Sequence, residues 1–229
     1  MNKVDFFQTA HYQRHNQRRQ EHLATLGLNL AGRSVLEVGA GVGDHTSFFL
    51  DRKCTVTSTD GRSELVALIR SRYSSVTTIE WDAETTPPPE LQPHEIVYCY
   101  GLLYHVKNPE FVLEKLASLT TELFLLETCV SFGENIAVNP VDECADDPTQ
   151  ALNGTGCRPT RQWIFATLKQ HFPYVYSTRT QPWHPEFPTQ WDLMTNSEAS
   201  LSRCVFVASR ISLSQDSLSD HLLTNQTRC

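Results

Sequence analysis

The chain has 229 residues, of which 40% are hydrophobic, and a formal net charge of -7. This length and apolar content suit one α/β domain with a full core, whereas the acidic balance weighs against a protein that binds by neutralising nucleic-acid phosphates. Seven scattered cysteines without Cys-x-x-Cys spacing indicate neither a disulfide framework nor a zinc site. The chain shows no apolar run near the roughly 20 residues of a membrane span and no signal-peptide core, so we expect it in the cytoplasm.

The first segment, residues 4–26, is predicted to be helical, with cationic and aromatic side chains between its few apolar positions. Its polar face is either solvated or forms a lid over a ligand. As a lid, the helix would place Tyr12 and an arginine near a carboxylate group of that ligand, because a planar guanidinium suits a carboxylate. We select Arg19 as this arginine. We therefore define residues 1–30 as an N-terminal helical lid.

Residues 34–44 have the pattern of an apolar strand, a glycine turn and a helix start. The strand carries one acid, Glu37, and glycines follow at positions 39, 41 and 43. Alternating glycines permit positive φ angles and close approach of a ligand to the backbone, while the new helix offers free N–H groups. A dinucleotide fingerprint needs Gly-x-Gly-x-x-Gly, and Asp44 stands at the position of its third glycine. The sequence therefore disfavours a nicotinamide cofactor.

The next two predicted strands end at acidic residues. The strand over residues 54–59 ends at Asp60, which follows Gly39 by 21 residues, the spacing of one strand–helix–strand step. An acid at this place accepts hydrogen bonds from ribose hydroxyls in doubly wound sheets, or it caps the following helix. The strand over residues 76–81 ends at Asp82. Residues 85–89 contain three prolines and cannot be helical.

The fourth and fifth predicted strands, residues 95–100 and 121–128, also lead to polar side chains. Tyr104 and His105 follow the fourth strand, Asn108 and Pro109 then start a helix, and Glu127 ends the fifth strand. Five alternations of strand with helix or loop predict a parallel, right-handed, doubly wound sheet. Ligands of such sheets bind at the carboxyl ends of the strands.

The remaining sequence is predicted to cover the acceptor side of the sheet. Residues 131–160 lack any helical or strand period and are interpreted as a substrate-side insertion, with solvated acids, because calcium-loop spacing is absent. A helix begins near residue 160, and two late strands span residues 174–180 and 201–209. The loop 181–200 is rich in aromatic residues and prolines, so it could wall an apolar pocket. Residues 211–229 are expected to form a loosely held polar tail.

The pattern Glu37-x-Gly39-x-Gly41-x-Gly43 resembles the first motif of the class I S-adenosylmethionine (SAM)-dependent methyltransferases of small-molecule type. The acids after the next strands and the Leu-Tyr-His turn also resemble this family, and the resemblance covers residues 33–128 well. It implies a Rossmann-like, doubly wound α/β fold with a seven-stranded sheet in the order 3-2-1-4-5-7-6. That sheet would be mostly parallel, with one antiparallel C-terminal strand. The methyltransferase domain would span residues 31–210.

The resemblance also implies SAM as cofactor and S-adenosylhomocysteine as product. In this family the first acid and the glycine turn face the methionine end and the ribose, and an acid after the third strand faces the adenine amino group. The expected cofactor-binding residues are Glu37, Gly39, Ala40, Gly41, Asp44, Asp60, Gly61, Arg62, Asp82, Ala83, Tyr100, Tyr12 and Arg19.

Methyl transfer is an in-line displacement in which the acceptor must lose or lack a proton, so a base with a near-neutral pKa helps. His105 is the candidate base, and Glu127 could orient it or bind substrate; alternatively, the histidine only packs on the cofactor. Tyr104, Trp183 and His184 are candidate substrate-binding residues, and no metal is expected. The expected acceptor is a nitrogen or oxygen of a small apolar or aromatic metabolite, as in natural-product biosynthesis. A tRNA-modifying SAM enzyme and a non-catalytic SAM-binding subunit remain alternatives.

Overall fold

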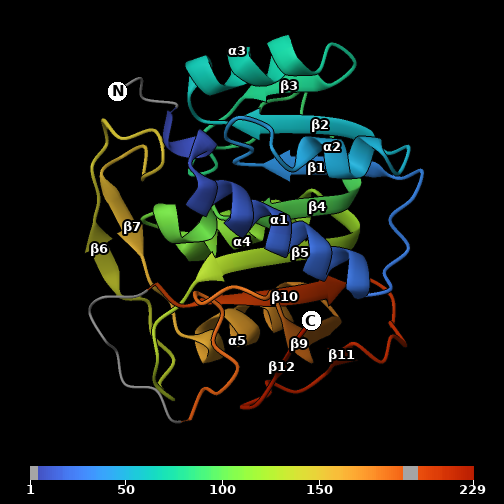
Figure 1. The fold of residues 1–229 in the computed structure, drawn as a ribbon, viewed down its shortest axis with the longest axis vertical. Coiled ribbons are helices and arrows are strands. Elements are labelled where there is room, and N and C mark those ends of the chain that lie inside the picture. Colours follow the sequence, from blue (N-terminus) through green and yellow to red (C-terminus); the bar gives the residue numbers. More distant parts are fainter. Residues whose placement is uncertain (1–4, 193–200) are drawn as a thin grey trace.

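The computed structural model describes residues 5–192 and 201–229. Helices and short strands alternate along most of this length, as the periodicity predicts (Figure 1). In chain order the elements are η1 (Asp5–Gln8), α1 (Ala10–Thr25), β1 (Ser34–Val38), α2 (Thr46–Leu50), β2 (Thr55–Asp60), α3 (Ser63–Arg72), β3 (Thr77–Glu80), β4 (His94–Tyr100), η2 (Leu103–His105), α4 (Pro109–Ser118), β5 (Thr120–Cys129), β6 (Pro140–Asp142), β7 (Thr155–Cys157), α5 (Arg161–His171), β8 (Tyr174–Thr178), β9 (Thr180–Gln181), β10 (Arg203–Ser209), β11 (Leu218–Ser219) and β12 (Thr227–Arg228).

The central sheet confirms the predicted doubly wound topology. Its strand order is β11-β8-β10-β5-β4-β1-β2-β3, which contains the predicted order 3-2-1-4-5-7-6 with β10 as the seventh strand and β8 as the sixth. Strands β1 to β5 run parallel, and β10 lies antiparallel between β5 and β8. The third crossover, through the prolines after β3, contains no helix, as expected.

The predicted strand count was one too low, because β11 extends the sheet beyond β8 in antiparallel orientation. The predicted loose tail was therefore also wrong. Leu218 in β11 is buried in the core, and the Ser217 hydroxyl donates a 2.7 Å hydrogen bond to the Leu26 carbonyl at the end of α1. Two buried positions within a mostly polar segment were too weak a signal to predict this strand.

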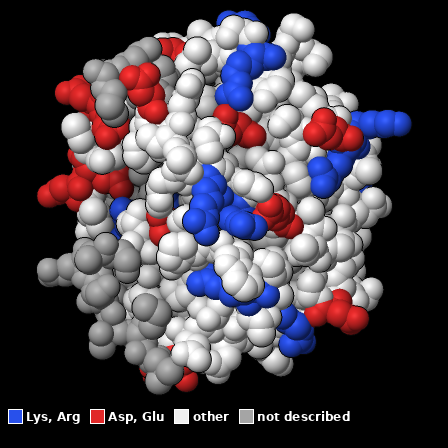
Figure 2. Space-filling view, in the orientation of Figure 1, with Lys and Arg blue, Asp and Glu red and all other residues white. Residues whose placement is uncertain are grey.

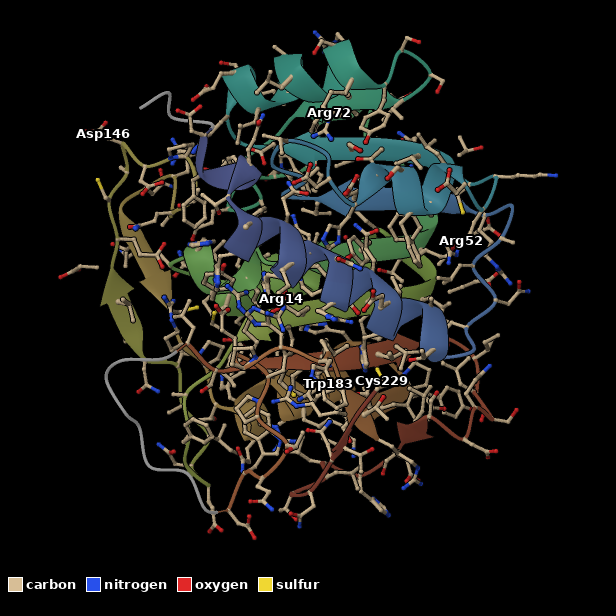
Figure 3. The ribbon with its side chains drawn as sticks, viewed as in Figure 1. Arg14, Arg52, Arg72, Asp146, Trp183 and Cys229 are labelled. Carbon is tan, nitrogen blue, oxygen red and sulfur yellow. The ribbon has the colours of Figure 1, made fainter. Side chains whose placement is uncertain are left out.

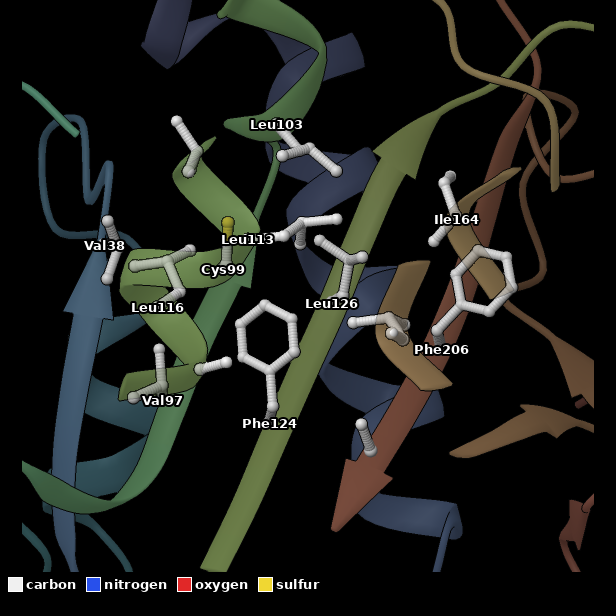
Figure 4. Close-up of a cluster of buried hydrophobic side chains, with 14 of the residues drawn as sticks. Val38, Val97, Cys99, Leu103, Leu113, Leu116, Phe124, Leu126, Ile164 and Phe206 are labelled. Atoms are coloured by element: carbon white, nitrogen blue, oxygen red, sulfur yellow. The ribbon is translucent and has the colours of Figure 1, made fainter. Parts of the chain in front are cut away.

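Apolar side chains fill both faces of the sheet because its central strands are buried on both sides. One cluster joins β1, β4, β5 and β10 to α4 and α5, and includes Val97, Phe124 and Phe206 (Figure 4). The other cluster packs α1, α2 and part of α3 against the opposite face. Within the described residues, no helix is both long and apolar enough to cross a membrane.

The insertion over residues 131–160 is more ordered than its composition predicts. It contains the antiparallel pair β6 and β7, and Thr160 caps α5 by accepting a hydrogen bond from the Trp163 amide. A Cβ atom added to Gly156 in β7 would lie 2.4 Å from the Tyr104 carbonyl oxygen, so only glycine allows β7 to pack this closely on η2. The insertion therefore lies directly against the turn that carries Tyr104 and His105.

The carboxyl ends of the parallel strands face the insertion. In Figure 1 the arrowheads of β1, β2 and β5 point toward the side where β6 and β7 lie, while α1 crosses in front of the sheet. Figure 2 shows acidic side chains gathered on that same side and cationic side chains over α1. The predicted ligand edge is thus bounded by the sheet, α1 and the insertion.

Candidate active site

A cavity of about 520 Å³ lies at the carboxyl edge of the sheet, between α1 and the insertion. Residues from most of the predicted motifs line it, although the motifs are far apart in the sequence. Those predicted for cofactor or substrate binding that line this cavity are Tyr12, Arg19, Gly39, Gly41, Asp60, Gly61, Arg62, Asp82, Ala83, Tyr100, Tyr104 and His105.

The glycine turn after β1 and the acid after β2 form one unit. Gly39 and Gly41 adopt positive φ angles of 67° and 58°, which glycine reaches without strain. The Asp60 carboxylate accepts hydrogen bonds from the amides of Gly41 and Arg62 at 2.9 and 3.0 Å. Burial raises the pKa of Asp60 to about 6, with these hydrogen bonds opposing the shift. Asp60 is therefore fixed at the cavity wall by the backbone of the turn.

Glu37 and Asp44 support this turn from behind instead of lining the cavity. The Glu37 carboxylate accepts hydrogen bonds from the hydroxyls of Thr46 and Ser58 at 2.6 and 2.8 Å, and burial raises its pKa to about 7. Asp44 pairs with Arg72 at 2.8 Å. Both acids line a smaller adjoining space of about 30 Å³, together with Ala40. Their contacts hold the helix start and β2 around the glycines.

The loops after β2 and β3 are tied to the insertion. The Arg62 guanidinium donates hydrogen bonds to the carbonyls of Ala145, Asp147 and Gln150 at 3.0 to 3.3 Å. Asp82 accepts a 3.3 Å hydrogen bond from the Asn153 side chain. Arg62 was predicted as a cofactor residue, and in the structure its charged end closes the insertion over this part of the cavity.

His105 pairs with an acid that the sequence did not identify. Its Nδ1 lies 2.5 Å from Oε2 of Glu143, whose side chain is only 5% exposed. The Ala151 amide and the Arg158 guanidinium also donate to this carboxylate. Of the two roles suggested for Glu127, orientation of His105 was wrong, and the expectation of solvated acids in the insertion was wrong for Glu143. The insertion brings Glu143 back onto η2, which local sequence patterns do not reveal.

The ionisation states of this pair suit a base held in one orientation. Burial acts to raise the pKa of Glu143, but the hydrogen bond and charge of His105, together with the Ala151 amide and the Arg158 charge, outweigh burial and lower the pKa. Burial lowers the pKa of His105, although the same hydrogen bond opposes the shift. A carboxylate can only accept hydrogen bonds, so Nδ1 of neutral His105 carries the proton and Nε2 has the free lone pair.

Glu127 instead lies below the cavity in a buried ion-pair cluster. Its side chain is fully buried, and its two oxygens pair with Arg19 at 2.8 Å and with Arg203 at 3.1 Å. Arg203 also donates to the Tyr104 hydroxyl at 3.0 Å and to Glu186 at 2.7 Å. Glu127 thus fixes two cavity-lining arginines, one from α1 and one from β10.

The N-terminal helix is docked on this cluster. Of the two predictions for its polar face, solvation is wrong for several residues, since His15, Asn16 and Arg19 are buried. Tyr12 and Arg19 line the cavity as the lid interpretation requires. Nearby, the buried Tyr100 hydroxyl has no hydrogen-bond partner among the described residues, so it is available to a ligand.

The aromatic loop after β9 contributes less than predicted. Trp183, labelled in Figure 3, is 57% exposed and does not line the cavity, so its predicted substrate contact is not seen. His184 is buried but also outside the lining, and its ring packs against His15 at 4.9 Å between centroids. Residues 193–200 of this loop lie outside the described part of the chain.

Comparisons with known proteins agree with this architecture. A family model described as a methyltransferase domain matches residues 35–122. The N-terminal domain of EvdMO1, crystallised in the presence of S-adenosylhomocysteine (SAH) and D-fucose, superposes with a TM-score of 0.63 at 20% identity over 88% of this chain and 84% of that one. A search of curated protein sequences gives no match.

Two further solved structures have the same fold. Magnesium protoporphyrin IX methyltransferase from Synechocystis PCC 6803, with bound SAM, gives a TM-score of 0.58 at 16% identity over 92% of this chain and 85% of that one. A SAM-dependent methyltransferase from Mesorhizobium loti gives 0.60 at 14% identity over 84% and 98%. This chain has the class I SAM-dependent methyltransferase fold.

In this methyltransferase fold, several site residues have no local sequence signal. Glu143 lies in a polar loop, and Glu186 lies in an aromatic loop. Arg203 lies within the predicted apolar strand over residues 201–209, and a cation there needs a buried partner for the same reason that Glu37 does. That argument could have placed Arg203 at the site, but it could not have named Glu127 as its partner.

The buried cluster predicts a large effect on stability. Glu127→Gln removes the negative charge between two buried guanidinium groups, so we expect a loss of about 3–5 kcal/mol in unfolding free energy, typical of breaking a buried pair. Urea unfolding at pH 7 measures this loss. Glu122→Gln is the matched control on the same strand, because Glu122 is 32% exposed in its pair with Arg33 and should lose at most about 1 kcal/mol. Equal losses in the two variants would contradict the role of the cluster.

Proposed function

We propose that this chain transfers a methyl group from SAM to a nitrogen or oxygen of a small-molecule acceptor. The observation that carries the proposal is one continuous cavity with two chemically different ends. One end has Asp60, Asp82 and the glycine turn, and the other has His105 held by Glu143. The first end suits a nucleoside, and the second suits removal of a proton from an acceptor.

The strand order supplies an axis for the cofactor. Strands β3, β2, β1 and β4 are neighbours in the sheet, so the loops that follow them lie in that order along its edge. Asp82 after β3 would meet adenine, Asp60 after β2 the ribose, and the amides around Gly41 the methionine part. The methyl group would then lie near Tyr100 at the end of β4, beside η2.

Solved relatives support a small acceptor. They include magnesium protoporphyrin IX methyltransferase, an EvdMO1 domain in the presence of D-fucose, and coclaurine N-methyltransferase bound to N-methylheliamine and SAH. The last has 18% identity and a TM-score of 0.51 over 66% of this chain and 47% of that one. In this chain the acceptor end includes Arg158, Arg203 and Glu186. This lining favours an acceptor that carries polar groups, beyond the small apolar or aromatic metabolite that the sequence predicts.

His105 would act as the base in this reaction. The sulfonium already activates the methyl group, so the protein mainly positions the acceptor in line, which can supply roughly 7–11 kcal/mol. His105 Nε2 would take the proton from the acceptor as its nitrogen or oxygen attacks the methyl carbon and the carbon–sulfur bond breaks. Glu143 would hold the ring and stabilise the resulting imidazolium, as a carboxylate does for a catalytic histidine.

Cofactor binding is tested at Asp60. Asp60→Ala should weaken SAM binding at least tenfold, about 1.4 kcal/mol, because the ribose hydroxyls lose their acceptor and the Gly41 turn loses its support. Isothermal titration calorimetry with SAM measures the affinity. Asp51→Ala, which removes an exposed acid after α2, is the control and should bind SAM as the wild type does. Unchanged affinity in Asp60→Ala would refute the ribose contact.

The raised pKa of Asp60 adds a pH dependence. Since its pKa is about 6, the carboxyl is mostly protonated at pH 5 and ionised at pH 7.5, and only the ionised form accepts from both hydroxyls. SAM affinity should therefore rise between pH 5 and 7. Calorimetry on Asp60→Asn across this range isolates the effect from other groups, and this variant should show a smaller pH dependence.

The base is tested at His105. His105→Ala should lower turnover by about 10²-fold or more, the usual range for a general base, while SAM affinity stays nearly unchanged. The assay is SAH formation with an acceptor selected from a panel of small amines and phenols, with bulk tRNA as a separate arm. His221→Ala, an exposed histidine remote from the cavity, is the control. Normal turnover in His105→Ala would exclude the role, and turnover with tRNA alone would replace the small-molecule proposal.

A further inference from the structure

Three possible metal ligands converge at the acceptor end of the cavity. One ring nitrogen each of His11 and His184 and one carboxylate oxygen of Glu186 all lie within 4.8 Å of one another. In a tetrahedral site with ligands about 2.0–2.1 Å from the ion, neighbouring ligand atoms lie about 3.4 Å apart. Small side-chain movements would therefore bring these three atoms to coordination distance.

The Glu186 carboxylate is already oriented for this role. Its Oε2 accepts a hydrogen bond from Arg203 Nε at 2.7 Å, whereas its Oε1 lies 3.2 Å from Nε2 of His11. One oxygen is thus held by the buried cluster, and the other faces the imidazole. Such outer contacts are what fix a ligating carboxylate in a metal site.

His184 is buried beside this carboxylate, and one of its ring nitrogens belongs to the group of possible ligand atoms. The Glu186 amide makes only a long contact of 3.4 Å with Nδ1 of His184, which is easily given up. A fourth imidazole, His15, lies next to the group: its Nε2 is 3.8 Å from Glu186 Oε2 and has no hydrogen-bond partner among the described residues.

We propose that His11, His184 and Glu186 bind a divalent transition-metal ion of the zinc type. Two imidazoles and one carboxylate are a ligand set that such ions prefer, whereas Mg²⁺ and Ca²⁺ prefer oxygen ligands. His11 and Glu186 also line the cavity, so the remaining coordination positions open toward it, as in sites that bind a substrate. No spacing in the sequence indicates this site, because one ligand comes from α1 and two come from the loop after β9.

The site has a consequence for the acceptor. An ion bound here would coordinate an acceptor oxygen and lower the pKa of a hydroxyl group, which favours oxygen over nitrogen as the methylated atom. This consequence rests on the proposed function, whereas the metal site itself does not. Metal binding in the absence of SAM therefore tests the site separately.

The experiment is a titration of the untagged, metal-free chain with Co²⁺, followed by its visible absorption bands, and with Zn²⁺ by calorimetry. We expect one equivalent to bind, with Mg²⁺ as a non-binding comparison. His11→Ala is the principal variant, because this side chain is 62% exposed and its removal leaves the core intact. It should weaken Co²⁺ binding at least tenfold, and Glu186→Gln should do the same.

His221→Ala is the matched control, since it removes an exposed histidine outside the cluster. It should bind Co²⁺ as the wild type does. Absence of Co²⁺ and Zn²⁺ binding by the folded wild type would overturn the proposal, as would unchanged Co²⁺ affinity in His11→Ala. Calorimetry with SAM on the same preparations keeps the two proposals distinct, because loss of metal binding with intact SAM binding affects only the metal site.

Discussion

The burial of Glu127 between two arginines is the constraint on which the cavity depends. A carboxylate at the end of a central strand, fully removed from water, is tolerated only with opposite charges and hydrogen bonds around it. Arg19 reaches it from α1 and Arg203 from β10, so one ionic cluster joins the N-terminal helix, the middle of the sheet and its antiparallel strand. The glycine at position 101 leaves room for this cluster, because a Cβ there would lie 3.1 Å from the Arg19 guanidinium. The geometry of the acceptor end therefore follows from where these three charges are placed.

The insertion imposes a second constraint by closing the cavity through polar contacts. Arg62 holds three of its carbonyls, Asp82 holds Asn153, and Glu143 holds His105. Each contact joins a residue that follows a strand to the same insertion. The insertion therefore covers both the loops that would bind the cofactor and the histidine that would contact the acceptor. Displacing the insertion would expose the nucleoside end and release the His105 ring together. In the proposed reaction, cofactor enclosure and orientation of the base would therefore be coupled through a single segment.

The sequence predicted those features that depend on short-range order. Alternating apolar strands, the glycine spacing and the 21-residue step from Gly39 to Asp60 are local patterns, and they predicted the sheet topology and the sheet edge at which the cavity lies. The contacts of Glu143 and Arg203 were not predicted, because their partners His105 and Glu127 lie 38 and 76 residues away in the sequence and no periodicity encodes such contacts. The prediction that Trp183 contacts the substrate relied too much on local composition. An aromatic residue in a loop satisfies the composition of a pocket wall, but only the tertiary path of the loop decides whether it faces the cavity or solvent.

The contact between Arg19 and Glu127 also bears on whether the N-terminal helix α1 can act as a lid. A lid that opens must separate from the sheet, and here that would leave Glu127 and Arg203 buried with one partner fewer, at a cost of several kcal/mol. His11 and Arg19 are eight residues apart on α1, about 12 Å along the helix axis, so one rigid helix contacts both Glu186 and Glu127. Because breaking the inner contact is costly, α1 acts as a wall of the cavity. Under the proposed function, an acceptor would enter more readily past the insertion, whose carbonyl and side-chain contacts can open without leaving the Glu127 cluster short of a partner.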